Sequence, residues 1–140
     1  MNWKLILKLS IFGVPMGILL VVGLFGAVDE VEGVLWFLIF FLCVWLIVKY
    51  CRRFYFLQGF LTSLLMDLWI TLILIAFFQT FLDNNPKIAF RFANPIEAEL
   101  TFLFTLQLLA IIFGLFLGLF AQGVAYMLKK RRLRRVRSSS

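Results

Sequence analysis

The 140-residue sequence contains no histidine, two cysteines and few charged residues, and each shortage excludes a class of protein. Charged residues make up 15% of the chain and hydrophobic residues 64%, whereas soluble domains are about 25% charged and about 45–50% apolar. Eighteen phenylalanines against three prolines exclude a disordered or collagen-like chain. A polytopic membrane protein remains, and the length allows roughly four or five spans of about 20 residues each.

Without histidine the chain also lacks the usual metal ligand and proton carrier. Cys43 lies inside an apolar run and Cys51 just beyond it, without a CxxC spacing. We therefore expect two unpaired thiols, no metal site and no cofactor. The sequence has no HExxH or GxSxG motif, no phosphate-binding loop and no paired carboxylates within its apolar runs, so we expect no enzymatic activity.

Four apolar runs predict an all-α fold, namely a polytopic transmembrane four-helix bundle. The expected spans form one domain, residues 1–128, which precedes a basic tail at 129–140; they are residues 5–28, 34–51, 57–82 and 97–128. Pro15 predicts a kink in the first span. The short acidic segment 29–33 predicts a tight turn in water.

Residues 83–99 form the only predicted loop of any size, and an interfacial helix, a strand and irregular structure are all compatible with its composition. At its end, Asn94 is suited to cap the last helix and Pro95 to occupy its first position. From Pro95 to Met127 the helix would measure roughly 50 Å, so it should project beyond a hydrocarbon core of about 30 Å. We expect the three terminal serines to be disordered.

Lysine and arginine are distributed unequally between the two sides of this arrangement. With four spans, twelve basic residues fall on the side of both termini, whereas only Lys87 and Arg91 fall on the other side, together with six of the seven acids. Basic residues are enriched in cytoplasmic flanks. The sequence therefore predicts that both termini are cytoplasmic.

The seventh acid, Asp67, lies near the middle of the third span, where a carboxylate is costly. Ser63 and Thr71 lie one helical turn to either side and complete a polar stripe. Two interpretations remain open. The stripe is a proton or ion site, or Asp67 is a structural group that hydrogen-bonds to a neighbouring helix.

The fourth span carries a face of small residues, which favours close helix approach. This face contains Gln107, Ala110, Gly114, Gly118, Ala121 and Ala125. Gly13 and Gly17 form a second candidate packing face in the first span. Contact within one bundle and self-association between chains both explain these patterns.

Beyond the fourth span the chain is strongly basic: Lys129, Lys130, Arg131, Arg132, Arg134, Arg135 and Arg137. Such a run beside a membrane is attracted to an anionic inner leaflet. RNA binding is the alternative, but no aromatic platform or folded module accompanies the charges, so we expect no nucleic-acid partner.

Several features together resemble small four-span bacterial inner-membrane proteins of unassigned function. They are the glycines of the first span (Gly13, Gly17), the basic connection 49–53 leading into Phe56-Leu57-Gln58-Gly59-Phe60, the Asn94-Pro95 pair and the terminal basic run. The resemblance implies a multi-pass protein of the bacterial inner membrane. Two functions are consistent with the sequence. One is a structural or accessory protein that contacts itself or a membrane partner, and the other is a small oligomeric channel or proton-coupled transporter that uses Asp67.

Reporter fusions test the predicted orientation. A periplasmic reporter such as alkaline phosphatase should be active when fused at position 90 and inactive at the C-terminus, because the twelve-to-two distribution of basic residues places only the former outside. A cytoplasmic position 90 would contradict the four-span arrangement.

Overall fold

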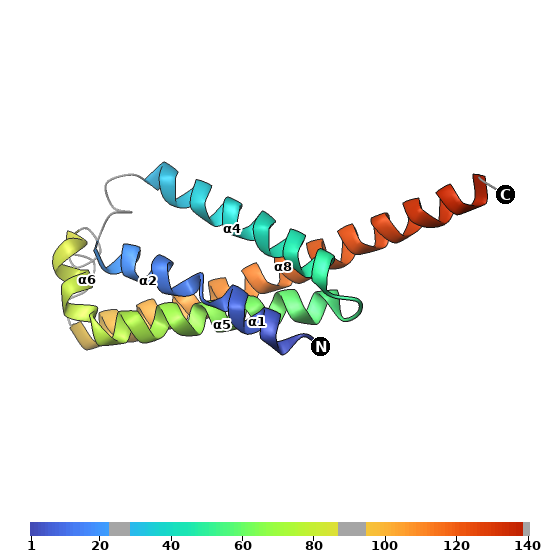
Figure 1. Cartoon of the computed structure of the whole chain (residues 1–140). Coiled ribbons are helices and arrows are strands. Elements are labelled where there is room, and N and C mark those ends of the chain that lie inside the picture. The colour runs from blue at the N-terminus through green and yellow to red at the C-terminus, as the bar shows by residue number, and fades with distance from the viewer. Residues whose placement is uncertain (23–28, 87–94, 139–140) are drawn as a thin grey trace.

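The computed structural model describes residues 1–22, 29–86 and 95–138, and the elements within these ranges are helices (Figure 1). They are α1 (Trp3–Ser10), α2 (Gly13–Val21), α4 (Asp29–Tyr50), α5 (Tyr55–Ala76), α6 (Phe78–Asn84) and α8 (Pro95–Ser138). Four stretches are long and apolar enough to cross a membrane: Trp3–Val21, Gly33–Tyr50, Tyr55–Ala76 and Glu99–Arg131. The expected all-α class and the expected number of candidate spans are therefore confirmed for the described residues.

The first span is broken between α1 and α2, four residues before Pro15. Proline has no N–H to donate to the carbonyl of Ile11, and its ring crowds that carbonyl. The backbone there makes hydrogen bonds between residues three positions apart instead of four. The Val14 N–H donates to the Ile11 carbonyl at 2.9 Å, and the Phe12 N–H donates to the Leu9 carbonyl at 3.2 Å. The predicted kink is confirmed, whereas residues 23–28 of the predicted span lie outside the described residues.

Several predicted boundaries differ from the structure, and the largest differences are at the turn 29–33 and at the end of the third span. The expected turn at 29–33 is wrong, because α4 already begins at Asp29. Acidic residues are favoured in the first turn of a helix, where they face the positive end of the helix dipole. The third span, predicted over 57–82, runs from Tyr55 to Ala76 and is followed by the separate helix α6.

Contacts with α2 explain why the third apolar run is divided. Phe78 and Phe81 of α6 are buried in a cluster with Met16 of α2. The side-chain amide of Asn84 donates to the Val21 carbonyl at 3.0 Å and that of Asn85 to the Leu20 carbonyl at 3.4 Å. These amides bond to carbonyls in the last turn of α2, where the regular hydrogen bonds of a helix run out. Tertiary contacts thus override the continuous apolar pattern.

The last helix, α8, has 44 residues and is therefore about 66 Å long. It begins at Pro95, as predicted, and extends beyond the other helices at its C-terminal end (Figure 1). The basic segment that was expected as a tail continues this helix to Ser138. Residues 139 and 140 lie outside the described residues, as do residues 87–94, which include the predicted cap Asn94 and about half of the predicted loop.

The contact between α5 and α8 is the most extensive in the described chain, and the two helices lie side by side (Figure 1). Glycines allow their backbones to approach. A Cβ atom on Gly59 would lie 2.9 Å from the Gly118 Cα, and one on Gly118 would lie 2.6 Å from the Phe56 carbonyl oxygen. Gly114 faces Phe60 and Ser63 of α5 in the same way. At Gly59 and Gly118 only glycine fits, because the Cβ atom would meet backbone atoms at less than 3.0 Å.

Helices α1 and α2 also pack against α5. Gly13 permits the closest approach, since a Cβ atom there would lie 2.3 Å from the Met66 carbonyl oxygen. Gly17 faces Ile70 and Ile73 one turn further along α5. Helix α5 is therefore in contact with every other described helix.

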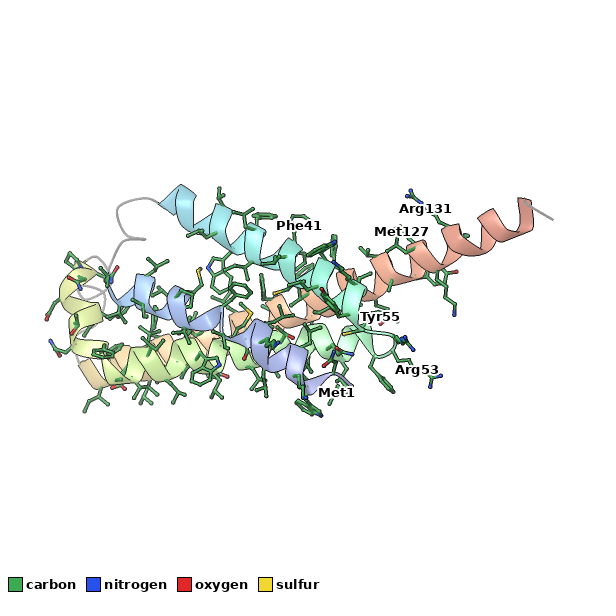
Figure 2. The ribbon with its side chains drawn as sticks, in the orientation of Figure 1. Met1, Phe41, Arg53, Tyr55, Met127 and Arg131 are labelled. Carbon is green, nitrogen blue, oxygen red and sulfur yellow. The ribbon has the colours of Figure 1, made fainter. Side chains whose placement is uncertain are left out.

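Helix α4 is held mainly near its C-terminal end. Cys43, Val44 and Ile47 are buried there in one cluster with Leu117 and Ala121 of α8. Towards Asp29 the helix diverges from α2 (Figure 1). Its outer surface is apolar and exposed, and Phe41 points away from the other helices (Figure 2).

Alanine substitutions test the glycine contacts. Gly13→Ala and Gly118→Ala should each destabilise the protein by about 1–3 kcal/mol, because the added methyl group meets backbone atoms that cannot easily move. Gly123→Ala is the matched control in α8, since nothing lies within 4 Å of its Cβ position. Unfolding in mixed micelles, followed by circular dichroism, measures the difference. Equal stability of the three variants would contradict the described packing.

Candidate functional site

The polar stripe predicted on the third span faces α8. The Ser63 hydroxyl donates to the Ala110 carbonyl of α8 at 3.0 Å. Ser63 and Asp67 are both buried. The two patterns noted in the sequence, the polar stripe and the small-residue face, therefore meet in the contact between α5 and α8.

Gln107 is the polar partner of this stripe. Its side-chain amide nitrogen Nε2 donates to the Asp67 Oδ2 at 2.5 Å and lies 3.3 Å from the Thr71 hydroxyl oxygen, to which it also donates. Two of the three candidate site residues, Asp67 and Thr71, thus share one amide of α8, whereas Ser63 bonds to the Ala110 carbonyl. Hydrogen bonds between membrane helices contribute about 0.6 kcal/mol on average and at most about 1.7 kcal/mol. This geometry agrees with the structural interpretation of Asp67.

Asp67 also lines a groove between α2, α4, α5 and α8, with a volume of about 460 Å³. The walls are mainly apolar and include four aromatic side chains: Trp36, Phe102, Phe113 and Phe116. Trp36 of α4 meets Phe113 of α8 edge to face, with ring centroids 5.4 Å apart. Asp67 is the only charged residue among the described residues of this lining. We call this feature the Asp67 groove.

The predicted packing faces are occupied within the chain. Gly114, Gly118 and Ala121 are buried, and both glycines contact α5. Gly13 and Gly17, both in α2, also contact α5. Ala125, at the end of the predicted face, is half-buried beyond the close contact.

The residues of the predicted basic tail extend α8 as a helix. Lys129, Lys130 and Arg131 are exposed on it. The backbone of Arg132, Arg134, Arg135 and Arg137 continues the same helix. Arg131 lies on the part of α8 that projects beyond the other helices (Figure 2).

Sequence reasoning missed the role of Gln58, which is only 2% exposed. Its side-chain oxygen accepts a hydrogen bond from the Cys51 thiol, and its amide nitrogen donates to the Arg53 carbonyl at 3.0 Å. One buried amide thus fixes the connection between α4 and α5. The available signal was a glutamine at the start of an apolar run, where an unpaired amide would be costly.

Both cysteines are free, as expected. Burial raises the pKa of the Cys51 thiol above its ordinary value, and this effect exceeds the opposing effects of the hydrogen bond from Cys51 to Gln58 and of the N-terminal charge. The thiol is therefore protonated at neutral pH, which is the form that can donate to Gln58.

No protein-family model matches the chain, and neither a curated protein nor a solved structure matches it. Among the described residues, no group of three histidine, cysteine, aspartate or glutamate side chains is placed to hold a metal ion. Function is therefore inferred from the geometry of this chain alone.

Proposed function

We propose that this chain is an integral membrane protein of structural or accessory type, without catalysis of its own, that acts through helix contacts with itself or with a membrane partner. The four apolar helices support a membrane location. We further propose a four-helix bundle in the bacterial inner membrane with both termini in the cytoplasm, for which the distribution of basic residues is the support.

The observation that carries this proposal is the weak attachment of α4. In the 18-residue apolar window of each span, 17% is buried inside the chain for Gly33–Tyr50, compared with 22% for Glu99–Arg131 and 39% for Tyr55–Ala76. Gly114 and Gly118 on the small-residue face of α8 are already in contact with α5 and are not available to another chain. A partner helix would therefore bind at the Asp67 groove and along α4, where apolar side chains are exposed and a concave surface is present.

Site-specific photocrosslinking tests this surface. Leu109 lines the Asp67 groove and is 56% exposed, whereas Leu72 is 51% exposed on α5 and is not part of the groove lining. With a photoreactive benzoylphenylalanine in place of Leu109, irradiation of native membranes should yield a protein adduct of higher mass, because a partner helix covers this position. Two differently tagged copies show whether the adduct is a homodimer.

The same residue in place of Leu72 is the matched control and should remain largely uncrosslinked to protein. Lipid adducts alone at position 109, or equal protein adducts at both positions, would contradict the proposed contact surface.

A second candidate function is a channel or proton-coupled transporter that uses Asp67. One observation favours it: the carboxyl group lines the Asp67 groove as well as accepting the hydrogen bond from Gln107. A carboxyl group that is reachable from a groove is placed to exchange a proton or bind a cation, which a fully enclosed structural group is not.

Asp67→Asn tests this second function. Asparagine preserves the size of the side chain and an oxygen that accepts from Gln107. Its amide does not ionise, so it cannot bind and release a proton as a carboxyl group does. If Asp67 carries the coupling proton, flux in proteoliposomes should fall by at least about tenfold while stability and assembly are preserved. Thr71→Val, on the same stripe, controls for loss of a hydrogen bond. Unchanged flux in Asp67→Asn, or no flux in the unsubstituted protein, would eliminate the transport function.

A further inference from the structure

A second groove lies at the opposite end of the span from α6, between the α4–α5 connection and α8. Its volume is about 710 Å³. Arg52 and Lys129 line it, together with the aromatic side chains of Tyr55 and Tyr126 and apolar side chains such as Leu119. We call this feature the basic groove. Arg53 and Tyr55 lie at the same end of the molecule as Met1 (Figure 2).

The basic groove joins two kinds of surface. Val48 and Leu119 belong to the apolar spans, whereas Arg52 and Lys129 lie beyond the ends of the Gly33–Tyr50 span and of the strongly apolar part of α8. No acidic residue is found among the described residues that line it. An occupant must therefore match an apolar wall at one end and two positive charges at the other.

The connection that carries Arg52 has a fixed conformation. Gln58 binds the residues on both sides of Arg52, accepting from the Cys51 thiol and donating to the Arg53 carbonyl. Phe54 completes the turn with a φ of 58°, in the left-handed region. The Arg52 backbone is consequently held between two anchored neighbours, so less conformational entropy is lost when its side chain binds a ligand.

Another cation at the end of α4, Lys49, is engaged elsewhere. The Lys49 ammonium group lies 4.6 Å from the ring centroid of Trp45 and 5.3 Å from that of Tyr50, both distances within the range of cation–π interactions. Lys49 is not part of the groove lining. The charge in the basic groove thus comes from two separate elements, Arg52 of the connection and Lys129 of α8.

We propose that the basic groove binds an anionic phospholipid, with its phosphate between Arg52 and Lys129 and an acyl chain along Val48 and Leu119. Basic pockets between membrane helices at the bilayer surface are suited to lipid head groups, and arginine binds phosphate well through its planar set of donors. Tyr55 and Tyr126, which also line the groove, supply amphipathic rings of the kind favoured at a membrane surface. Free phosphate would leave the apolar wall unused, and a zwitterionic lipid would not match the net positive charge.

Native mass spectrometry of the purified full-length protein, with added phosphatidylglycerol or phosphatidylcholine, tests the proposal. The unsubstituted protein should retain phosphatidylglycerol in preference to phosphatidylcholine. The double variant Arg52→Gln/Lys129→Gln should bind phosphatidylglycerol about tenfold more weakly, since it loses both groove charges. Arg53→Gln/Lys130→Gln is the matched control. It removes the same charge from neighbouring positions that do not line the groove and should change the affinity by less than about twofold.

Leu119→Trp provides an independent variant that keeps both charges. Because Leu119 lines the basic groove, the larger side chain should displace the acyl chain and lower phosphatidylglycerol binding without any change in charge. Helix content and melting temperature of each variant are measured by circular dichroism. If the double groove variant is misfolded, Leu119→Trp decides the outcome.

Three results would overturn the proposal. Equal losses in the two double variants would show that diffuse positive charge, rather than the groove, attracts the lipid. Equal retention of phosphatidylcholine would show that the apolar wall alone is recognised. Full competition by inorganic phosphate at concentrations similar to that of the lipid would identify a phosphate site instead of a phospholipid site.

Discussion

Apolar side chains gain little when they leave lipid for the surface of another helix, so helices in a membrane associate through close backbone approach and through hydrogen bonds between them. Helices α5 and α8 use both. Gly59 and Gly118 allow the two backbones to approach closely. More than two helical turns away in the same contact, Gln107 donates a hydrogen bond to Asp67. The Gln107–Asp67 bond gives the buried carboxyl group a partner that lipid could not supply. The remaining helices are arranged around this pair.

The arrangement of the other helices follows from how much of α5 and α8 remains available. Gly13 brings the first span onto another side of α5, where Met66 contributes its backbone oxygen to the contact. The buried residues of helix α4 lie in the C-terminal half of its length, at Cys43, Val44 and Ile47, whereas Trp36 and Ile39 are only partly buried. Its divergence contributes to the Asp67 groove, and the length of α8 carries Lys129 to the connection that holds Arg52. Both grooves are thus consequences of a strong central helix pair with a loosely attached neighbour.

Much of this pattern was predictable from the sequence because hydropathy and side-chain size act locally. The four spans, the break before Pro15, the polar stripe around Asp67 and the small-residue face around Gly114 all follow from spacing along one helix. That the stripe and the face would contact each other did not follow, since the sequence does not state which helices are neighbours. Asp67 and Gln107 are 40 positions apart and meet only through the tertiary arrangement.

Other features depend on conformations that leave little trace in composition. The division between α5 and α6 falls within the predicted third span, and the amides of Asn84 and Asn85 attach this end of the chain to the end of α2. The left-handed conformation at Phe54 could not be predicted, because no glycine occupies that position.

The most direct test of the central helix pair is solid-state NMR in lipid bilayers, with ¹⁵N-labelled glutamine side chains and ¹³C-labelled aspartate carboxyl groups. The structure predicts a strong coupling between Gln107 Nε2 and the Asp67 carboxyl carbon, corresponding to a distance below about 4 Å and abolished by Gln107→Leu. The absence of that coupling in a folded sample would contradict the described contact between α5 and α8.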